Sequence, residues 1–334
     1  MEFTIYNEFS EALKQEWNNL LAQSTPHVPF LRYEYLYAWW QHRGGGEWPQ
    51  EAELALIVGH EGGKMVGVAP CFSAVHEDRK CLMLLGSIEI SDYLDVISKD
   101  KDRERFIKGL VEFVRSCPGA LGEVKALDLY NILEDSPTLP VFQSMPEAAI
   151  EELQHSPYIK LPGDWETYLS GIDGKQRHEI RRKMRRAVEA EVPAELYFTT
   201  EADKLEADME CFLVLMSQDE EKAAFLTPAM REQMKEIMRV AFAGRVLQLV
   251  FLKIGGEFAA GYLNADYLNR IWVYNSGLDR RFMEYSPGWV LLGHLLQWAN
   301  ENKRDELDFM RGDEEYKYRF GAVDRHVMRV TLKF

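Results

Sequence analysis

The chain has 334 residues, of which 46% are hydrophobic, and a formal net charge of −15 at pH 7. This length favours two domains over a single core, and the acidic balance disfavours nonspecific adhesion to nucleic acid or anionic membranes. No run of about 18 apolar residues is present, and the start MEFTIYNEFSEALK lacks the basic and then apolar pattern of a signal peptide. We therefore expect a cytoplasmic protein without a membrane span.

The first predicted elements are a strand at residues 3–6 and an aromatic helix at residues 29–43, PFLRYEYLYAWWQHR. This helix either packs in the core or forms a wall of a substrate cleft, since Arg32 and its tyrosines add polar tips to apolar bodies. We keep Arg32 as a candidate substrate contact.

A hairpin pattern occurs twice. Residues 54–58 followed by Gly62-Gly63 match residues 247–251 followed by Gly255-Gly256, at a constant offset of 193. Two apolar strands joined by a Gly-Gly turn at one fixed offset indicate a duplicated domain.

Asp92 and Tyr93 lie between two strand-like runs, the second of which covers residues 93–97. They either cap a strand at a turn or face a substrate cleft. We keep both as candidate substrate contacts.

Three prolines between residues 137 and 146, followed by the acidic stretch 147–152, mark a linker near residue 150. The predicted domains are therefore 1–150 and 151–334. Strands alternate with helices in both halves, including predicted helices at 205–217 and 229–242, so the fold class is α/β or α+β.

Four cysteines stand apart in the sequence, with no CxxC pair and no pairing with histidine: Cys71, Cys81, Cys117 and Cys211. This spacing predicts buried free thiols rather than a disulfide framework or a zinc site, and no metal is expected.

Residues 175–186, KQRHEIRRKMRR, hold seven Lys or Arg side chains and one acidic side chain, Glu179. On a helical wheel Ile180, Met184 and Val188 lie on the apolar side, and most of the basic residues lie elsewhere. The segment is either a solvated basic face or a platform for an anion, such as substrate phosphates or the backbone of tRNA.

Residues 271–310 predict a strand, a helix and a second strand that runs parallel to the first. Ser286-Pro287-Gly288 opens the helix, with a capping serine, a proline at the first helical position and a glycine that admits a ligand close to the backbone. Together with Arg280 and Arg281, this start suits an anion such as a pyrophosphate.

The run DFMRGDEEYKYRFG at residues 308–321, placed after a Ser-Pro-Gly helix, resembles the closing motif of the CelD-like proteins associated with cellulose biosynthesis. These proteins belong to the GNAT acyltransferase superfamily. The Tyr-Lys-x-x-Phe-Gly part is also similar to the end of the Fem peptidoglycan-bridge aminoacyltransferases, which are built from two GNAT-like domains.

The resemblance implies tandem GNAT-like domains, each a mixed twisted sheet flanked by helices, with a degenerate N-terminal copy. It implies catalytic roles for Lys317 and Asp308. Expected contacts to an acyl-CoA co-substrate are Tyr274, Arg280, Arg281, Ser286 and Gly288, and expected substrate contacts are Tyr316 together with Arg177 and Arg181, which match an Arg-x-x-Ile-Arg helix of the Fem enzymes. The chain departs from the Arg/Gln-x-x-Gly-x-Gly/Ala signature of ordinary acetyl-CoA enzymes.

The expected function is therefore an N-acyltransferase that uses an acyl-CoA-type thioester and an amine of a small or cell-envelope-precursor substrate. Two alternatives stay open. One keeps the fold and uses aminoacyl-tRNA as the donor, and the other is a noncatalytic binding protein for an anionic saccharide precursor.

Overall fold

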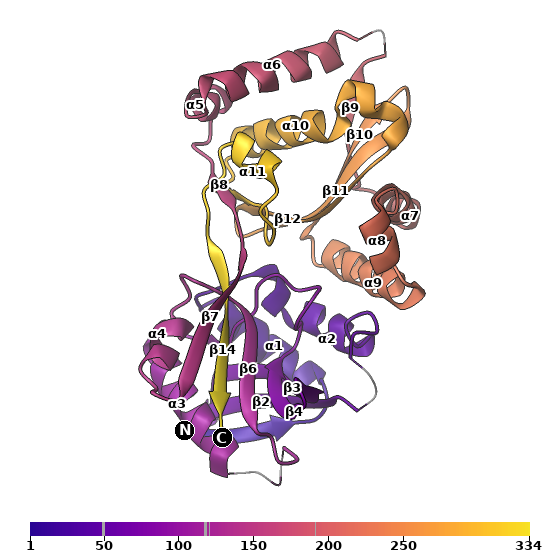
Figure 1. The fold of residues 1–334 in the computed structure, drawn as a ribbon. Coiled ribbons are helices and arrows are strands. Elements are labelled where there is room, and N and C mark those ends of the chain that lie inside the picture. The colour runs from indigo at the N-terminus through magenta and orange to yellow at the C-terminus, as the bar shows by residue number, and fades with distance from the viewer. Residues whose placement is uncertain (49–50, 117–118, 120, 191) are drawn as a thin grey trace. The chain divides into compact units, whose positions relative to one another are not determined.

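The computed structural model describes residues 1–48, 51–116, 119, 121–190 and 192–334, so Cys117 lies outside the described residues. The chain divides into two compact units, Met1–Gln154 with Arg325–Phe334, and His155–Asp324 (Figure 1). No described helix is both long and apolar enough to cross a membrane.

The first unit is built on a sheet in the order β1-β2-β3-β4-β6-β14-β7, with β5 paired to β3. Its strands are β1 (Glu2–Tyr6), β2 (Glu53–Glu61), β3 (Lys64–His76), β4 (Arg79–Leu84), β5 (Ile97–Ser98), β6 (Ala126–Leu133), β7 (Ala148–His155) and β14 (His326–Lys333). Its helices are α1 (Glu11–Leu21), η1 (Pro29–Leu31), α2 (Tyr33–Gln41), α3 (Asp100–Ser116) and α4 (Thr138–Gln143).

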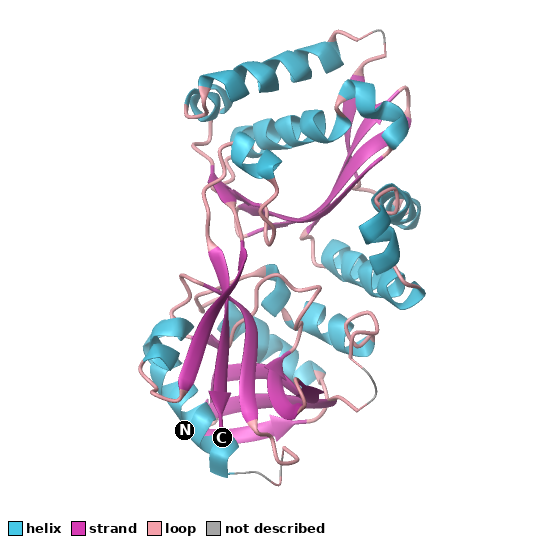
Figure 2. Cartoon of the chain, in the orientation of Figure 1, coloured by secondary structure: helices cyan, strands magenta, loops and turns pink. Residues whose placement is uncertain are grey.

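The second unit has a sheet in the order β8-β13-β12-β11-β10-β9, with α10 on one face and α7 and α9 on the other (Figure 2). Its strands are β8 (Tyr158–Lys160), β9 (Ala194–Phe198), β10 (Leu247–Ile254), β11 (Glu257–Tyr267), β12 (Arg270–Leu278) and β13 (Glu306–Asp308). Its helices are α5 (Trp165–Ser170), α6 (Gly174–Val188), α7 (Leu205–Met216), α8 (Glu220–Phe225), α9 (Pro228–Ala243), η2 (Arg280–Tyr285), α10 (Pro287–Glu301) and α11 (Glu315–Arg319). The mixed α/β class is as predicted.

The two matching hairpins adopt the same geometry. Both Gly-Gly turns have positive φ at each glycine, 55° and 75° in β2–β3 and 62° and 83° in β10–β11, as a tight hairpin turn requires. The strand register shifts between Gly59 and His60 in one hairpin and between Leu252 and Lys253 in the other. These shifts are again 193 residues apart, so the shared bulge supports the duplication.

Helix α6 packs along α10 through a narrow apolar side. Ile180 and Met184 are buried, and a Cβ added to Gly293 of α10 would lie 2.8 Å from the sulfur of Met184, so this glycine lets the two helices approach closely. Val188 was expected on the same side, but 56% of its surface is exposed. The helix ends at this residue.

The predicted domain boundary needs two corrections. The acidic stretch 147–152 is not a linker, because most of it forms β7 of the first sheet. The last residues, Arg325–Phe334, were predicted to belong to the second domain, 151–334. They belong to the first unit instead, because β14 lies between β6 and β7.

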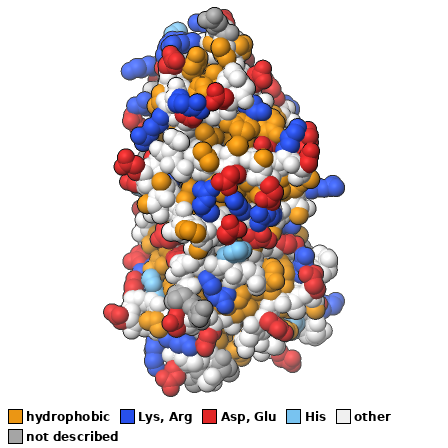
Figure 3. Space-filling model, turned by 90° about the vertical axis from the view of Figure 1, so that its right-hand side faces the viewer, with side chains coloured by type: hydrophobic (Ala, Val, Ile, Leu, Met, Phe, Trp, Pro, Cys, Tyr) orange, Lys and Arg blue, Asp and Glu red, His pale blue; other side chains and the backbone are white. Residues whose placement is uncertain are grey.

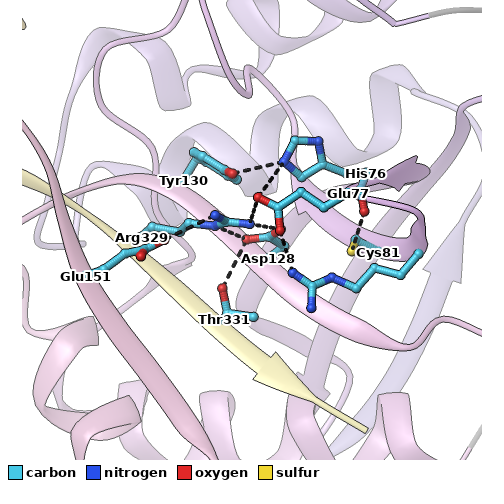
Figure 4. A network of polar contacts seen from close by, with 9 residues as sticks. His76, Glu77, Cys81, Asp128, Tyr130, Glu151, Arg329 and Thr331 are labelled. Carbon is cyan, nitrogen blue, oxygen red and sulfur yellow. Dashed lines mark hydrogen bonds and ion pairs between the residues drawn. The ribbon is translucent and has the colours of Figure 1, made fainter.

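A buried ion-pair network holds β14 in the first sheet (Figure 4). The guanidinium of Arg329 donates to both carboxylate oxygens of Asp128 on β6 at 2.7 Å, and it pairs with Glu77 at 2.9 Å and Glu151 at 3.1 Å. Asp128 is fully buried, and a bidentate pair of this kind is both strong and geometrically specific. The network therefore fixes the register of the last strand.

Candidate functional site

The site forms where two parallel strands of the second sheet separate. Strand β12 pairs with β13 only from Arg270 to Trp272, whereas it stays paired with β11 as far as Leu278. The register between β11 and β12 skips Tyr274, which is therefore the extra residue of a β-bulge. From the bulge onwards, one edge of β12 has no strand partner among the described residues.

The open edge of β12 carries backbone groups that point away from β11. The amide of Asp279 donates to the carbonyl of Ala259 at 2.9 Å, and hydrogen-bonded pairs alternate along an antiparallel ladder. Ser276 and Leu278 therefore direct their N–H and C=O groups to the open edge. At Ser276 the amide donates to Oδ1 of Asn275 at 2.8 Å, and the carbonyl accepts from Nζ of Lys222 at 2.6 Å.

The start of α10 lies next along the chain. Pro287 occupies the first helical position, as predicted, and the first N–H groups of a helix have no partner within it. Ser286 stands at the N-cap, but its φ is 52° and its side chain makes no capping hydrogen bond, so the predicted side-chain cap is wrong. A Cβ at Gly288 would meet only Leu278, at an ordinary 3.7 Å, so space is open beside this turn.

A pocket of about 490 Å³ connects these features. This volume is in the range of small-molecule sites, and most of its lining is apolar or aromatic. The lining residues come from α7 and α8, β11 and β12, η2, α10 and α11, and are Leu215, Met216, Gln218, Asp219, Lys222, Ala260, Gly261, Tyr262, Ser276, Gly277, Leu278, Arg280, Met283, Gly288, Trp289, Leu291, Tyr316 and Phe320.

Two tyrosines face each other in this pocket. Burial raises the pKa of both Tyr262 and Tyr316, and the nearby charge of Glu314 adds to the rise. Both phenols therefore keep their protons at neutral pH. A protonated hydroxyl in an apolar pocket can donate to a developing negative charge.

Of the residues predicted to bind a co-substrate, Arg280 and Gly288 line the pocket, and Tyr274 forms the bulge next to it. Arg281 does not line it. Its guanidinium pairs with Asp279 at 2.8 Å and Glu257 at 2.7 Å, whereas Arg280 is exposed and forms no ion pair with a described residue. The two neighbouring arginines are thus not equivalent.

The two predicted catalytic residues lie beside the pocket rather than in its lining. Lys317 is 3% exposed, and its Nζ donates to the carbonyls of Phe309, Arg311 and Gly312 and pairs with Glu314 at 2.8 Å. This environment is that of a lysine that ties a loop together.

Asp308 is fully buried, and its Oδ1 accepts from the amide of Met310 at 2.7 Å. The residue therefore stabilises the turn after β13, and its predicted catalytic role stays a prediction. Tyr316, predicted as a substrate contact, lies in the pocket lining. It is the second residue of α11, which follows the loop after β13.

The predicted basic platform lies on α6 and has little free charge at its two named residues. Arg177 donates to the carbonyls of Leu169 and Ser170, at the end of α5, and Arg181 pairs with Glu166. Neither residue lines the pocket.

The remaining predicted contacts belong to the first unit. Arg32 precedes α2 and pairs with Glu34 at 3.5 Å, and Asp92 and Tyr93 are 8% and 1% exposed. The strand expected at 93–97 forms only at its last residue and Ser98, as β5. The hydroxyl of Tyr93 accepts from Arg325 at 3.5 Å. The contacts and burial of these three side chains are those of residues that stabilise the fold. Their predicted substrate contacts stay predictions.

The described cysteines are free, as expected: Cys71 and Cys81 are buried and Cys211 is half-buried. Burial raises the pKa of each thiol. Their thiols are therefore protonated at neutral pH and poor nucleophiles.

The sequence analysis missed Lys222, Tyr262, Ser276 and Trp289, all of which line the pocket. Tyr262 and Ser276 occupy opposite register positions on β11 and β12, so a correct strand pairing would have found them. Nothing in the local sequence around Lys222 distinguishes it from a surface lysine.

Residues 174–318 match a family model described as an acetyltransferase (GNAT) domain. This match lies within the second unit. No curated protein matches the chain, but solved structures do.

Three of these structures have the same fold over nearly the whole chain. FemX is similar with a TM-score of 0.69 and 10% identity, over 99% of this chain and 97% of its own. A conserved protein of unknown function from Bacteroides thetaiotaomicron is similar with a TM-score of 0.62 and 12% identity, over 100% of both chains. A tandem GNAT protein from the clavulanic acid biosynthesis pathway is similar with a TM-score of 0.54 and 15% identity, over 98% of this chain and 97% of its own.

At such low identity these likenesses show the fold alone. They support the predicted tandem GNAT-like fold, and the relation to the Fem enzymes and the CelD-like type stay predictions.

Proposed function

We propose that this protein is an N-acyltransferase that moves an acyl group from an acyl-CoA-type thioester to the amine of a small molecule or cell-envelope precursor. The observation that carries the proposal is the open edge of β12, which begins at the bulge of Tyr274 and runs beside the pocket to the start of α10. An extended thioester has amide groups that pair with such an edge and phosphates that suit a helix start.

In this proposal the amide-bearing arm of the donor pairs with the backbone of Leu278 and passes Ser276, whose amide and carbonyl already bond to Asn275 and Lys222. Its phosphates meet the first turn of α10 at Gly288 and the side chain of Arg280. The free guanidinium of Arg280 supports this assignment, whereas the two carboxylates on Arg281 argue against an equal role for that residue. Ser286 then contributes through its backbone position rather than through a cap.

Acyl transfer needs a carbonyl group held in position, an acceptor for the proton that the amine loses and a donor of a proton to the departing thiolate. The amine nitrogen attacks the thioester carbon, the C–N bond forms, and the C–S bond breaks with loss of a proton from nitrogen. In our proposal the departing thiolate takes its proton from the Tyr262–Tyr316 pair, and the proton that nitrogen loses restores the hydroxyl of that pair. The backbone at the Tyr274 bulge faces the carbonyl oxygen. Lys317 and Asp308 support the loop that holds Tyr316.

Release of free thiol from acetyl-CoA in the presence of amines tests this function. We expect turnover by the wild type, and a fall in kcat of about 100-fold for Tyr316→Phe, the scale of a lost general acid. Tyr318→Phe, whose hydroxyl donates to Asp324 at 3.3 Å away from the pocket, is the matched control and should retain activity. Absence of thiol release from any acyl-CoA would contradict the proposal.

A second candidate donor is aminoacyl-tRNA, because α6 exposes Lys175, Arg185 and Arg186 without ion pairs to described residues. Unpaired cations of this kind bind a phosphate backbone. Binding of tRNA that weakens steeply with salt, and that is lost in Arg185→Gln/Arg186→Gln, would favour this donor. No binding at low salt would exclude it.

A further inference from the structure

Helix α8 brings one charged side chain into an otherwise mostly apolar pocket. None of its residues, Glu220–Phe225, is buried, so no side chain of this helix anchors it in the core. Lys222 is half-buried and reaches across to β12, where Nζ donates to the carbonyl of Ser276 at 2.6 Å and approaches its hydroxyl at 3.3 Å. Figure 3 shows the face of the second unit that carries α7, α8 and α9, where apolar side chains gather among charged ones.

The ammonium of Lys222 has no ion-pair partner among the described residues. Two other partly or fully buried lysines of the second unit do have one, since Lys317 pairs with Glu314 at 2.8 Å and Lys235 with Glu210 at 2.8 Å. A third, Lys253, instead lies over the rings of Tyr197 and Phe258. A charge that is drawn out of water without a counter-charge is unfavourable. Unlike Lys253, Lys222 lies over no aromatic ring of a described residue, so its charge has neither kind of partner there.

The nearest carboxylates are already in use. Asp219 lines the pocket but caps α8, since its Oδ1 accepts from the amide of Lys222 at 3.1 Å. Glu314 pairs with Lys317. Burial lowers the pKa of Lys222, the charges of Asp219 and Glu314 offset part of this effect, and the charge of Lys317 adds to it. An anion placed beside the ammonium would stabilise its charged form further.

We propose that Lys222 binds a carboxylate of the acceptor, so that the acceptor is an amine with an apolar body and a carboxylate, such as an apolar amino acid. The inference rests on the proposed function and names the acceptor class of the same pocket. The apolar body would contact the walls formed by Leu278, Trp289 and Phe320. A charge-assisted hydrogen bond in a dry pocket then gives selectivity against the uncharged amide of the same compound.

Paired probes test this inference without turnover. Calorimetry would compare L-phenylalanine with L-phenylalaninamide, and L-leucine with L-leucinamide. We expect the wild type to bind each acid roughly tenfold more tightly than its amide, which equals about 1.4 kcal/mol. The preference should vanish in Lys222→Gln and persist in part in Lys222→Arg.

Lys235→Gln is the matched control, because Lys235 is also half-buried but lies outside the pocket and has a carboxylate partner. It should keep the wild-type preference. Circular dichroism of each variant establishes that it is folded. The inference is wrong if neither acid binds the wild type more tightly than its amide, or if folded Lys222→Gln keeps the preference.

A separate titration with acetyl-CoA distinguishes this inference from the proposed function. If acetyl-CoA does not bind or react, the proposed function fails whatever the acids do. If acetyl-CoA binds and Lys222→Gln weakens only that binding, Lys222 belongs to the donor site and the inference is overturned.

Discussion

Lys317 illustrates how a single buried side chain can hold a loop. Its ammonium bonds three backbone carbonyls and Glu314, so Lys317→Met would leave these groups without a donor. We expect the free energy of unfolding to fall by about 2–4 kcal/mol, as measured by chemical denaturation. The exposed lysine Lys204, paired with Glu201 at 2.9 Å, is the control, and Lys204→Met should change stability by less than about 0.5 kcal/mol.

The same variant tests the catalytic role predicted for Lys317. A stable Lys317→Met protein that has lost turnover would support catalysis and contradict the structural role. A destabilised protein that keeps its turnover at low temperature would contradict catalysis.

His27 gives the first unit a dependence on acid. Burial, and secondly the charge of Arg32, lower the pKa of His27 from 6.5 to about 4. The unfolded chain therefore binds a proton at higher pH than the folded chain does. Stability is complete above pH 6.5 and is lost as the pH falls towards 4. In thermal unfolding, His27→Gln should show a smaller fall over this window than the wild type, and an equal fall would contradict the assignment.

At the scale of elements, two glycines near the pocket have opposite surroundings. A Cβ at Gly277 of β12 would lie 2.3 Å from the backbone nitrogen of Met216, whereas at Gly288 of α10 it would meet only Leu278 at 3.7 Å. Gly277→Ala should push α7 off the sheet and lower the free energy of unfolding by about 1–3 kcal/mol. Denaturant titration measures this loss.

Gly288→Ala should fold with wild-type stability, because the helix start has room for a methyl group. It should bind acetyl-CoA more weakly, because the methyl group occupies the space that our proposal gives to the donor. Unchanged affinity for acetyl-CoA in this variant would argue against a donor at the start of α10.

The sequence predicted the elements around the pocket better than it predicted the pocket. The Ser-Pro-Gly start of α10 and the parallel strand β13 follow from local patterns, and both are present. The contribution of α8 could not be predicted, since a six-residue helix with no buried side chain has no periodic apolar pattern. The register of β11 against β12, which brings Tyr262 to Ser276, also depends on long-range packing.

At the scale of the whole chain, the last strand serves the first unit. Deletion of residues 325–334 should remove one of the two strands paired with β6 and leave Asp128 without its guanidinium partner. In hydrogen exchange, we expect amides of β6 to lose protection while those of β10 and β11 keep theirs. Equal loss in both sheets would contradict the division into two units.

This return of the chain also explains why the predicted second domain, 151–334, included a strand that belongs to the first unit. Arg329 and Asp128 are 201 residues apart, so no local composition signal links them. The duplicated hairpin was visible because both copies keep the same turn residues. Strands and crossovers follow local sequence patterns, so the fold class was predictable. The pairing of strands far apart in the chain does not follow such patterns, so it was not.

The most direct test of a donor site at the start of α10 is a thermal-shift titration with acetyl-CoA, a longer acyl-CoA and free CoA. A ligand that binds only the folded state stabilises it by about 2.7 kcal/mol at a hundred times Kd. We predict a dose-dependent rise in Tm that Arg280→Gln reduces and Arg281→Gln leaves nearly unchanged, because Arg281 is held by two carboxylates. No rise with any of the three ligands, or equal effects of the two substitutions, would contradict the account.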